Sequence, residues 1–155
     1  MTINETYNFF ESLLSQPNKK SDIKIYEEFL EILTHLKNRG LSEDEIQSIE
    51  RELKSLNLKS NPENRKKYFK KALSTFEKYL KDTFSLTSKG YYTKLYSGLG
   101  VGFGILFGVV FLSSWERSLG ISMGLIFGYT IGMLIGRNLD NQAEKENRVL
   151  KVSQS

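Results

Sequence analysis

Cysteine is absent from the 155 residues of this chain, proline occurs twice and histidine only once. Without cysteine the protein has no disulfides and no thiolate metal ligands. The lone histidine, His35, excludes paired-histidine zinc motifs, and we expect it to have a structural role. A glycine-flanked serine of the nucleophile-elbow type is also missing. We therefore predict that the protein is not an enzyme and that it binds no cofactor and no metal.

Charged residues are missing from two long stretches near the end of the chain. Residues 95–114 and 119–136 contain no Asp, Glu, Lys or Arg. As helices they would be about 30 and 27 Å long, which is enough to cross the hydrocarbon core of a bilayer. The sequence predicts a transmembrane helical hairpin over residues 95–137, with a short turn between its two helices. The lack of charge within the spans argues against a proton relay or an ion-coupled transporter.

Glycine is concentrated in the same region, which holds ten of the twelve glycines of the chain. Five of them recur at every fourth residue of the second span: Gly120, Gly124, Gly128, Gly132 and Gly136. Two sets in the first span fall on nearly opposite helix faces: Gly100, Gly104 and Gly108 on one, and Gly98 and Gly102 on the other. Glycine grooves let helix backbones approach closely in membranes. We expect one groove of the first span to pack against the second span and the other to receive a second copy of the protein.

A buried, soluble hairpin is the alternative interpretation of these two segments. In water, however, each glycine costs a helix about 1 kcal/mol relative to alanine, so ten of them would destabilise it severely. Inside a bilayer no water competes for the backbone, so the helix persists. The glycine content therefore favours the membrane interpretation.

Residues 1–88 carry apolar residues at helical spacing among many charged ones. We predict that they form a cytoplasmic domain of about four helices. Ser42 and Glu45 have the spacing of a capping box at the start of the third helix. Ser21 is expected to cap the second helix, and Asn61-Pro62 to start the fourth.

The predicted fold class is all-α, because no segment alternates apolar and polar residues as a strand would. The helical domain and the hairpin are joined by a hinge at residues 89–94, and a polar cytoplasmic tail follows at residues 138–155. The opening MTINETYNFFESLL has no basic leader and no long apolar run. We therefore expect no secretory signal peptide.

Positive charge collects in the last part of the helical domain. The net charge is −4 over residues 1–58 and +7 over residues 59–94. The predicted fourth helix, a basic juxtamembrane helix, carries five basic residues close together: Arg65, Lys66, Lys67, Lys70 and Lys71. This cluster is either a solvated helix face or a surface for anionic lipid headgroups, which attract basic residues by about 1 kcal/mol each. Nucleic acid is an unlikely partner, because no recognition motif accompanies the charge.

Aromatic and basic residues flank the two spans in a pattern that predicts their orientation. Tyrosine and tryptophan suit the interfacial belt of a membrane, and four lie at the predicted interfaces: Tyr91, Tyr92, Tyr96 and Trp115. Seven Lys or Arg residues lie before the first span or after the second, whereas the turn holds Arg117 beside Glu116. The positive-inside rule then places both termini in the cytoplasm. We expect a multi-pass protein of the bacterial cell (inner) membrane.

Two segments of the chain resemble a known kind of protein. The paired GxxxG spans end in IGRNLDNQAEKENRVL, and FEKYLKDTFSLTSKGYYTKL precedes them. Over roughly residues 60–150 the chain resembles small bacterial membrane proteins of the glycine-zipper type, a largely uncharacterised family. The resemblance implies a two-span membrane hairpin with a cytoplasmic basic tail. It implies no active site.

Two classes of function fit these features. In the first, the protein is a membrane-anchored, self-associating interaction module whose helical domain engages a cytoplasmic protein. In the second, several hairpins assemble into a membrane-permeabilising oligomer, as an effector or toxin would. A water-filled pore needs a polar lining, and in the second span only Ser122, Tyr129 and Thr130 offer one. The first class is therefore the preferred hypothesis.

Overall fold

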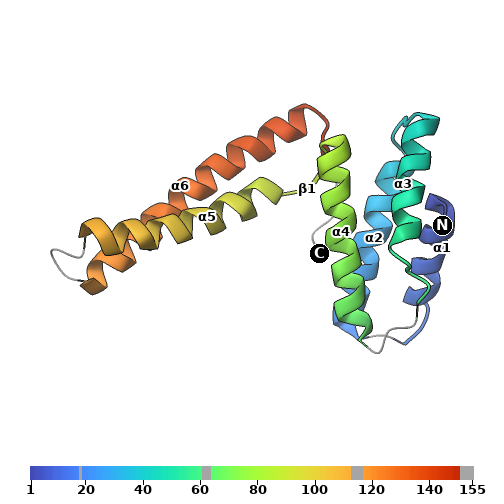
Figure 1. The fold of residues 1–155 in the computed structure, drawn as a ribbon, viewed down its shortest axis with the longest axis horizontal. Coiled ribbons are helices and arrows are strands. Elements are labelled where there is room, and N and C mark those ends of the chain that lie inside the picture. The colour runs from blue at the N-terminus through green and yellow to red at the C-terminus, as the bar shows by residue number, and fades with distance from the viewer. Residues whose placement is uncertain (18, 61–63, 113–116, 151–155) are drawn as a thin grey trace. The chain divides into compact units, whose positions relative to one another are not determined.

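The computed structural model describes residues 1–17, 19–60, 64–112 and 117–150 (Figure 1). The described residues form six α-helices, which confirms the predicted all-α class. The helices are α1 (Ile3–Leu14), α2 (Lys20–Lys37), α3 (Glu43–Ser55), α4 (Arg65–Phe84), α5 (Tyr91–Phe107) and α6 (Arg117–Lys145). A π-helical turn, η1 (Gly108–Leu112), continues α5. The described residues also contain two short strands, β1 (Thr87–Ser88) and β2 (Val149–Leu150).

The chain folds into two compact units. The first, the helical unit, comprises Met1–Thr87 together with Leu150–Ser155, and the second, the hairpin unit, comprises Ser88–Val149. The helical unit holds α1 to α4, and the hairpin unit holds α5, η1 and α6.

Aromatic side chains form the centre of the helical unit. Phe10 of α1 stacks on Phe29 of α2 with ring centroids 4.3 Å apart, and it meets Phe69 of α4 edge-on at 5.7 Å. Tyr26 and Phe76 extend the same cluster along α2 and α4. Such pairs are worth about 0.5–1.5 kcal/mol beyond the area they bury. The cluster therefore holds three of the four helices to one another.

The helix starts agree with the sequence in part. The capping box at α3 is confirmed: the Ser42 hydroxyl accepts from the Glu45 backbone N–H, and the Glu45 carboxylate accepts from Ser42 N–H at 2.7 Å. The prediction for Ser21 was wrong, because α2 begins at Lys20, two residues earlier than a cap at Ser21 would place it. Lys19 is at the cap position, and its side chain makes no capping hydrogen bond. The Ser21 hydroxyl instead donates to Asp22, which lies beside it in the first turn.

The start of α4 can be compared with the sequence only from Asn64 onward. The expected start at Asn61-Pro62 lies outside the described residues. The described helix begins at Arg65, and the Asn64 side chain accepts a hydrogen bond from Lys67 N–H at 3.1 Å. Asparagine is a favourable N-cap because its side-chain oxygen satisfies a free N–H of the first turn.

The helical unit takes its last core residue from the far end of the chain. After α4, Ser85 adopts a left-handed conformation (φ 56°), and Leu86 turns back into the core with 3% of its surface exposed. Leu150 joins the same core and is 1% exposed. Strands β1 and β2 pair as a two-stranded sheet. The chain therefore leaves the helical unit after Thr87 and returns to it at Leu150.

The hairpin unit differs from its predicted bounds at both ends. Helix α5 begins at Tyr91, inside the expected hinge, because Gly90 takes a left-handed conformation (φ 74°) and starts the helix there. Helix α6 continues through the expected tail to Lys145. Asn147, at φ 54°, then ends it, and Arg148 N–H donates to the Ala143 carbonyl at 2.8 Å. This left-handed C-terminal bond pattern stops a helix and turns the chain. Residues 113–114, at the end of the predicted first span, lie outside the described residues.

Candidate functional site: a glycine-lined hairpin with an open outer face

Glycines meet glycines along much of the contact that α5 and η1 make with α6. Gly100 lies against Gly128, Gly104 against Gly124, and Gly108 against Gly120. At the end nearer Gly90 the same contact continues through residues of α5 other than glycine. There Gly132 lies against Tyr96 and Ser97, and Gly136 lies against Tyr92 and Thr93. Each step of four residues along one helix is matched by a step of four in the opposite direction along the other.

The contact is a contact of backbones rather than of side chains. A Cβ atom built on Gly128 would meet the carbonyl oxygen of Gly100, and one built on Gly104 would meet the carbonyl oxygen of Gly124. The glycine hydrogens therefore point at carbonyl oxygens of the facing helix. Such Cα–H···O contacts recur where helices approach closely and are worth about 0.5–1 kcal/mol each. No larger residue fits at these positions unless the helices separate.

Two glycines of α5 lie outside this contact. A Cβ atom added to Gly98 or to Gly102 would meet nothing within 4 Å. Both residues are exposed, and the exposed Leu95, Leu99 and Leu106 lie beside them on the same helix. The ten predicted packing glycines thus divide into eight that close the hairpin and two that remain on its outer face.

The outer surface of the hairpin is apolar. The most exposed large side chains are Phe103 (70%), Val110 (67%), Leu106 (63%), Ile126 (60%) and Leu134 (59%). Two helices, Tyr91–Val110 and Leu119–Lys145, are long and apolar enough to cross a membrane. Only 11% and 22% of their most apolar segments are buried, whereas the core helix of a soluble protein would be mostly buried.

One carboxylate closes the base of the hairpin, which we define as the end where α5 begins and α6 ends. Asp140 of α6 accepts hydrogen bonds from Tyr92 N–H (3.0 Å), Thr93 N–H (2.9 Å) and the Thr93 hydroxyl (2.6 Å). These N–H groups belong to the first turn of α5, where Gly90 offers no side-chain cap. Asp140 therefore caps one helix from the other, and its negative charge suits a helix N-terminus. The sequence analysis did not identify this residue.

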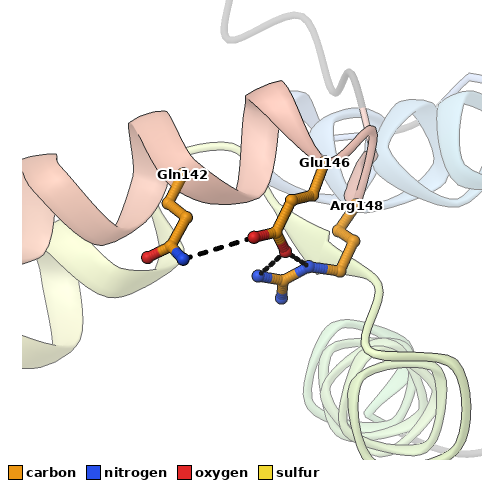
Figure 2. A network of polar contacts seen from close by, with 3 residues as sticks. All are labelled: Gln142, Glu146 and Arg148. Atoms are coloured by element: carbon orange, nitrogen blue, oxygen red, sulfur yellow. Dashed lines mark hydrogen bonds and ion pairs between the residues drawn. The ribbon is translucent and has the colours of Figure 1, made fainter.

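A second polar cluster lies at the same base (Figure 2). Glu146 accepts from Gln142 at 3.2 Å and pairs with Arg148 at 2.6 Å. Hydrogen bonds to Glu146 and to Tyr92 raise the pKa of the Arg148 guanidinium, so it stays charged. The pair is partly exposed, so its contribution to stability is small.

The predicted interfacial tyrosines all fall in the first two turns of α5. Tyr91 and Tyr92 pack edge-to-face with ring centroids 5.2 Å apart, and Tyr96 lies one turn further along. All three are partly exposed. Their place at the base of the hairpin is where a membrane interface would meet it. The fourth predicted belt residue, Trp115, lies outside the described residues.

The five residues of the predicted basic cluster, Arg65, Lys66, Lys67, Lys70 and Lys71, lie in the first two turns of α4 and are exposed. They are at the opposite end of α4 from Phe84, where the chain continues toward the hairpin. Lys66 and Phe84 are about 27 Å apart along the helix.

In the part of the chain that the structure describes, no three His, Asp or Glu side chains are grouped to hold a metal ion. His35 lies partly exposed on α2. Comparison with protein-family models, with curated proteins and with solved structures gave no significant match. The resemblance to glycine-zipper membrane proteins and the assignment as a non-enzyme therefore stay predictions.

Proposed function

We propose that this chain is a small integral membrane protein whose hairpin unit crosses the bilayer twice. The observation that carries the proposal is that the hairpin is the reverse of a soluble protein in its packing. Backbones meet inside it, and large apolar side chains cover its outside. In water this arrangement exposes its apolar surface and gains little from its core. In a bilayer the exposed side chains meet lipid, and the close backbone contact supplies the packing that holds membrane helices together.

Both ends of the hairpin lie on the cytoplasmic side in this proposal. Asp140 ties the end of α6 to the start of α5, so the two ends belong to one side of the membrane. Lysine and arginine near these ends favour the cytoplasmic side. The membrane in question is the bacterial inner membrane, as the resemblance in sequence implies.

The helical unit serves as the cytoplasmic part of a self-associating interaction module. The hairpin anchors it, a second hairpin covers the groove at Gly98 and Gly102, and the basic cluster of α4 attracts anionic lipid headgroups. Self-association is supported by the open glycines, which the hairpin itself does not use. A cytoplasmic protein is the expected partner of the helical unit.

A membrane-permeabilising oligomer is the less favoured function. A water-filled pore needs a polar lining. In the described part of the second span the polar side chains on the outer face are Ser122, Tyr129 and Thr130, and the Thr130 hydroxyl already donates to the Ile126 carbonyl of its own helix. Such a face is too apolar to line a water-filled pore.

A reporter fused after Ser155 tests the proposed topology. A reporter that is active only in the cytoplasm should be active there, and one that is active only in the periplasm should be silent. The protein should also stay with the membrane pellet after alkaline extraction. A periplasmic C-terminus, or release of the protein by alkali, would refute the proposal.

A further inference from the structure

A groove of the helical unit runs between α2 and α4. Ser21 and Lys24 line it from α2, and Lys66, Lys70 and Ser74 line it from α4. Lys66 and Lys70 belong to the basic cluster that the sequence indicated, but Lys24 is more than forty residues away in the chain. The fold therefore brings Lys24 into the same groove as two lysines of the basic cluster.

The direction of the helices orders the charges along this groove. Tyr26 packs against Phe69, and three residues later Phe29 packs against Phe76. Helices α2 and α4 therefore run in the same direction, as Figure 1 also shows.

Because of this parallel order, the groove has a basic end and an acidic end. Lys24, Lys66 and Lys70 lie toward the N-termini of the two helices. The two acidic residues of the lining, Glu28 and Glu77, lie one to two turns further along.

Among the described residues the charge of the basic end is balanced only in part, because Asp22 in the first turn of α2 is one carboxylate beside three lysines. Lys24, Lys66 and Lys70 form no ion pair with any described residue there. The first turn of α4 contains no acidic residue. Cations at a helix N-terminus are unfavourable because they face the positive end of the helix dipole. The arrangement costs stability that a bound anion would restore.

We propose that the basic end of the α2–α4 groove binds a phosphate group. The three ammonium groups supply charge-assisted donors of the kind that phosphate oxygens accept. The walls beneath, Ile25 and Leu73, are buried and apolar, so they suit the carbon skeleton that carries the phosphate. Glu28 and Glu77 repel a second anion and limit the site to one phosphate. The phosphate belongs to an anionic lipid headgroup or to a small soluble phosphate ester.

The neighbouring lysines provide a matched control. Lys67 and Lys71 carry the same charge on the same helix, but each is turned by about 100° from Lys66 or Lys70 and does not line the groove. Of these four lysines of α4, a groove site depends only on Lys66 and Lys70. Diffuse attraction of the basic cluster depends on both pairs equally.

The test uses the full chain in nanodiscs, with the double variant Lys66→Gln/Lys70→Gln compared with Lys67→Gln/Lys71→Gln. In the first arm, phosphatidylcholine nanodiscs are titrated with glycerol 3-phosphate, and the thermal unfolding of the helical unit is followed. Ligand that binds the folded state raises the unfolding midpoint, while the general stabilising effect of phosphate is the same for both variants. In the second arm, native mass spectrometry counts the phosphatidate molecules retained from mixed nanodiscs.

We expect the groove variant to bind at least about tenfold more weakly in one or both arms, and the control variant to bind as the wild type does. Loss in the first arm alone assigns the site to a soluble ester, and loss in the second arm alone assigns it to a lipid. Equal loss in both variants, or no binding by the wild type, overturns the inference. The inference rests on the proposed membrane location only for its lipid arm, and the topology reporter tests that location separately.

Discussion

Asp140 shows how much one side chain contributes at the base of the hairpin. Its carboxylate accepts from two backbone N–H groups and one hydroxyl of α5. The residue was not identified from the sequence, although a signal was present. The signal is the spacing of four residues that runs from Gly120 to Gly136, because its next position along α6 is Asp140. Gly136 lies against Tyr92, and Asp140 is therefore close to the start of α5.

Replacing Asp140 by alanine should free the first turn of α5. We expect the loss of the cap to cost about 1 kcal/mol locally, the usual effect of deleting an N-cap. Hydrogen exchange should therefore accelerate at the Tyr92 and Thr93 amides. Glu144→Ala, one turn along the same helix, is the control and should leave both amides protected. Unchanged protection in the Asp140 variant would show that the cap does not form.

Glu45 makes the helical unit sensitive to acid. Hydrogen bonds from the Ser42 backbone N–H and hydroxyl lower the pKa of Glu45 below its ordinary value of 4.5. Because the folded-state pKa lies below the unfolded one, this contribution is present above pH 4.5 and is lost as the pH falls through the folded-state pKa.

Urea unfolding at several pH values measures this effect. Glu45→Gln keeps an oxygen for the cap but does not titrate, so we expect a smaller loss of stability between neutral pH and pH below 4.5. Glu43→Gln removes a charge from the same turn and should keep the wild-type pH dependence. The account of the cap fails if the two variants behave alike.

At the scale of elements, the glycines of α5 fall into two classes that the sequence spacing already separated. Gly100 and Gly104 lie against the facing backbone, and Gly98 and Gly102 face outward. Periodicity indicated these faces because four residues turn a helix by about 400°, so every fourth residue stays on one side. The spacing could not show which groove the second helix uses.

Alanine at Gly128 should open the hairpin, while alanine at Gly102 should not. The added methyl group at Gly128 meets a backbone carbonyl that cannot move aside, and such overpacking typically costs about 1–3 kcal/mol. Spin labels on the exposed residues Leu106 and Phe127 report the separation of the helices. We expect a longer and broader distance for Gly128→Ala and the wild-type distance for Gly102→Ala. A wild-type distance in both variants would refute the close backbone contact.

The outward glycines should instead control self-association. Gly98→Ile with Gly102→Ile fills the open groove, so crosslinking in native membranes should yield fewer dimers while the spin-label distance stays unchanged. If the wild type yields only monomer at high expression, the proposed self-association is wrong.

At the scale of the whole molecule, Leu150 returns the end of the chain to the helical unit. The sequence indicated helices because apolar spacing is local, and it indicated the Ser42–Glu45 cap because the partners are three residues apart. Leu150 packs in a core whose other members lie more than sixty residues earlier. No local pattern encodes such a contact. Lys24 was not assigned to the basic cluster for the same kind of reason, since it lies more than forty residues before Lys66.

Shortening Leu150 should therefore weaken the helical unit, although the four helices of that unit end at Phe84. Leu150→Ala should lower the free energy of unfolding of the helical unit by about 2–5 kcal/mol, as for other fully buried leucines. Urea unfolding of the full chain in mild detergent measures the change. Lys145→Ala, which alters the exposed end of α6, is the control. Equal stability of the two variants would show that Leu150 lies outside the core in solution.

The central claim is that the two apolar helices cross a membrane with both ends of the hairpin on one side. Because the chain has no cysteine, single cysteines report this directly. Ser118→Cys lies at the start of α6, and Ser88→Cys and Asn141→Cys lie at the base of the hairpin. A membrane-impermeant maleimide added to intact spheroplasts should label Ser118→Cys alone, and the other two only after the membrane is permeabilised. Labelling of all three in intact spheroplasts, or of Ser88→Cys and Asn141→Cys on opposite sides, would contradict the account.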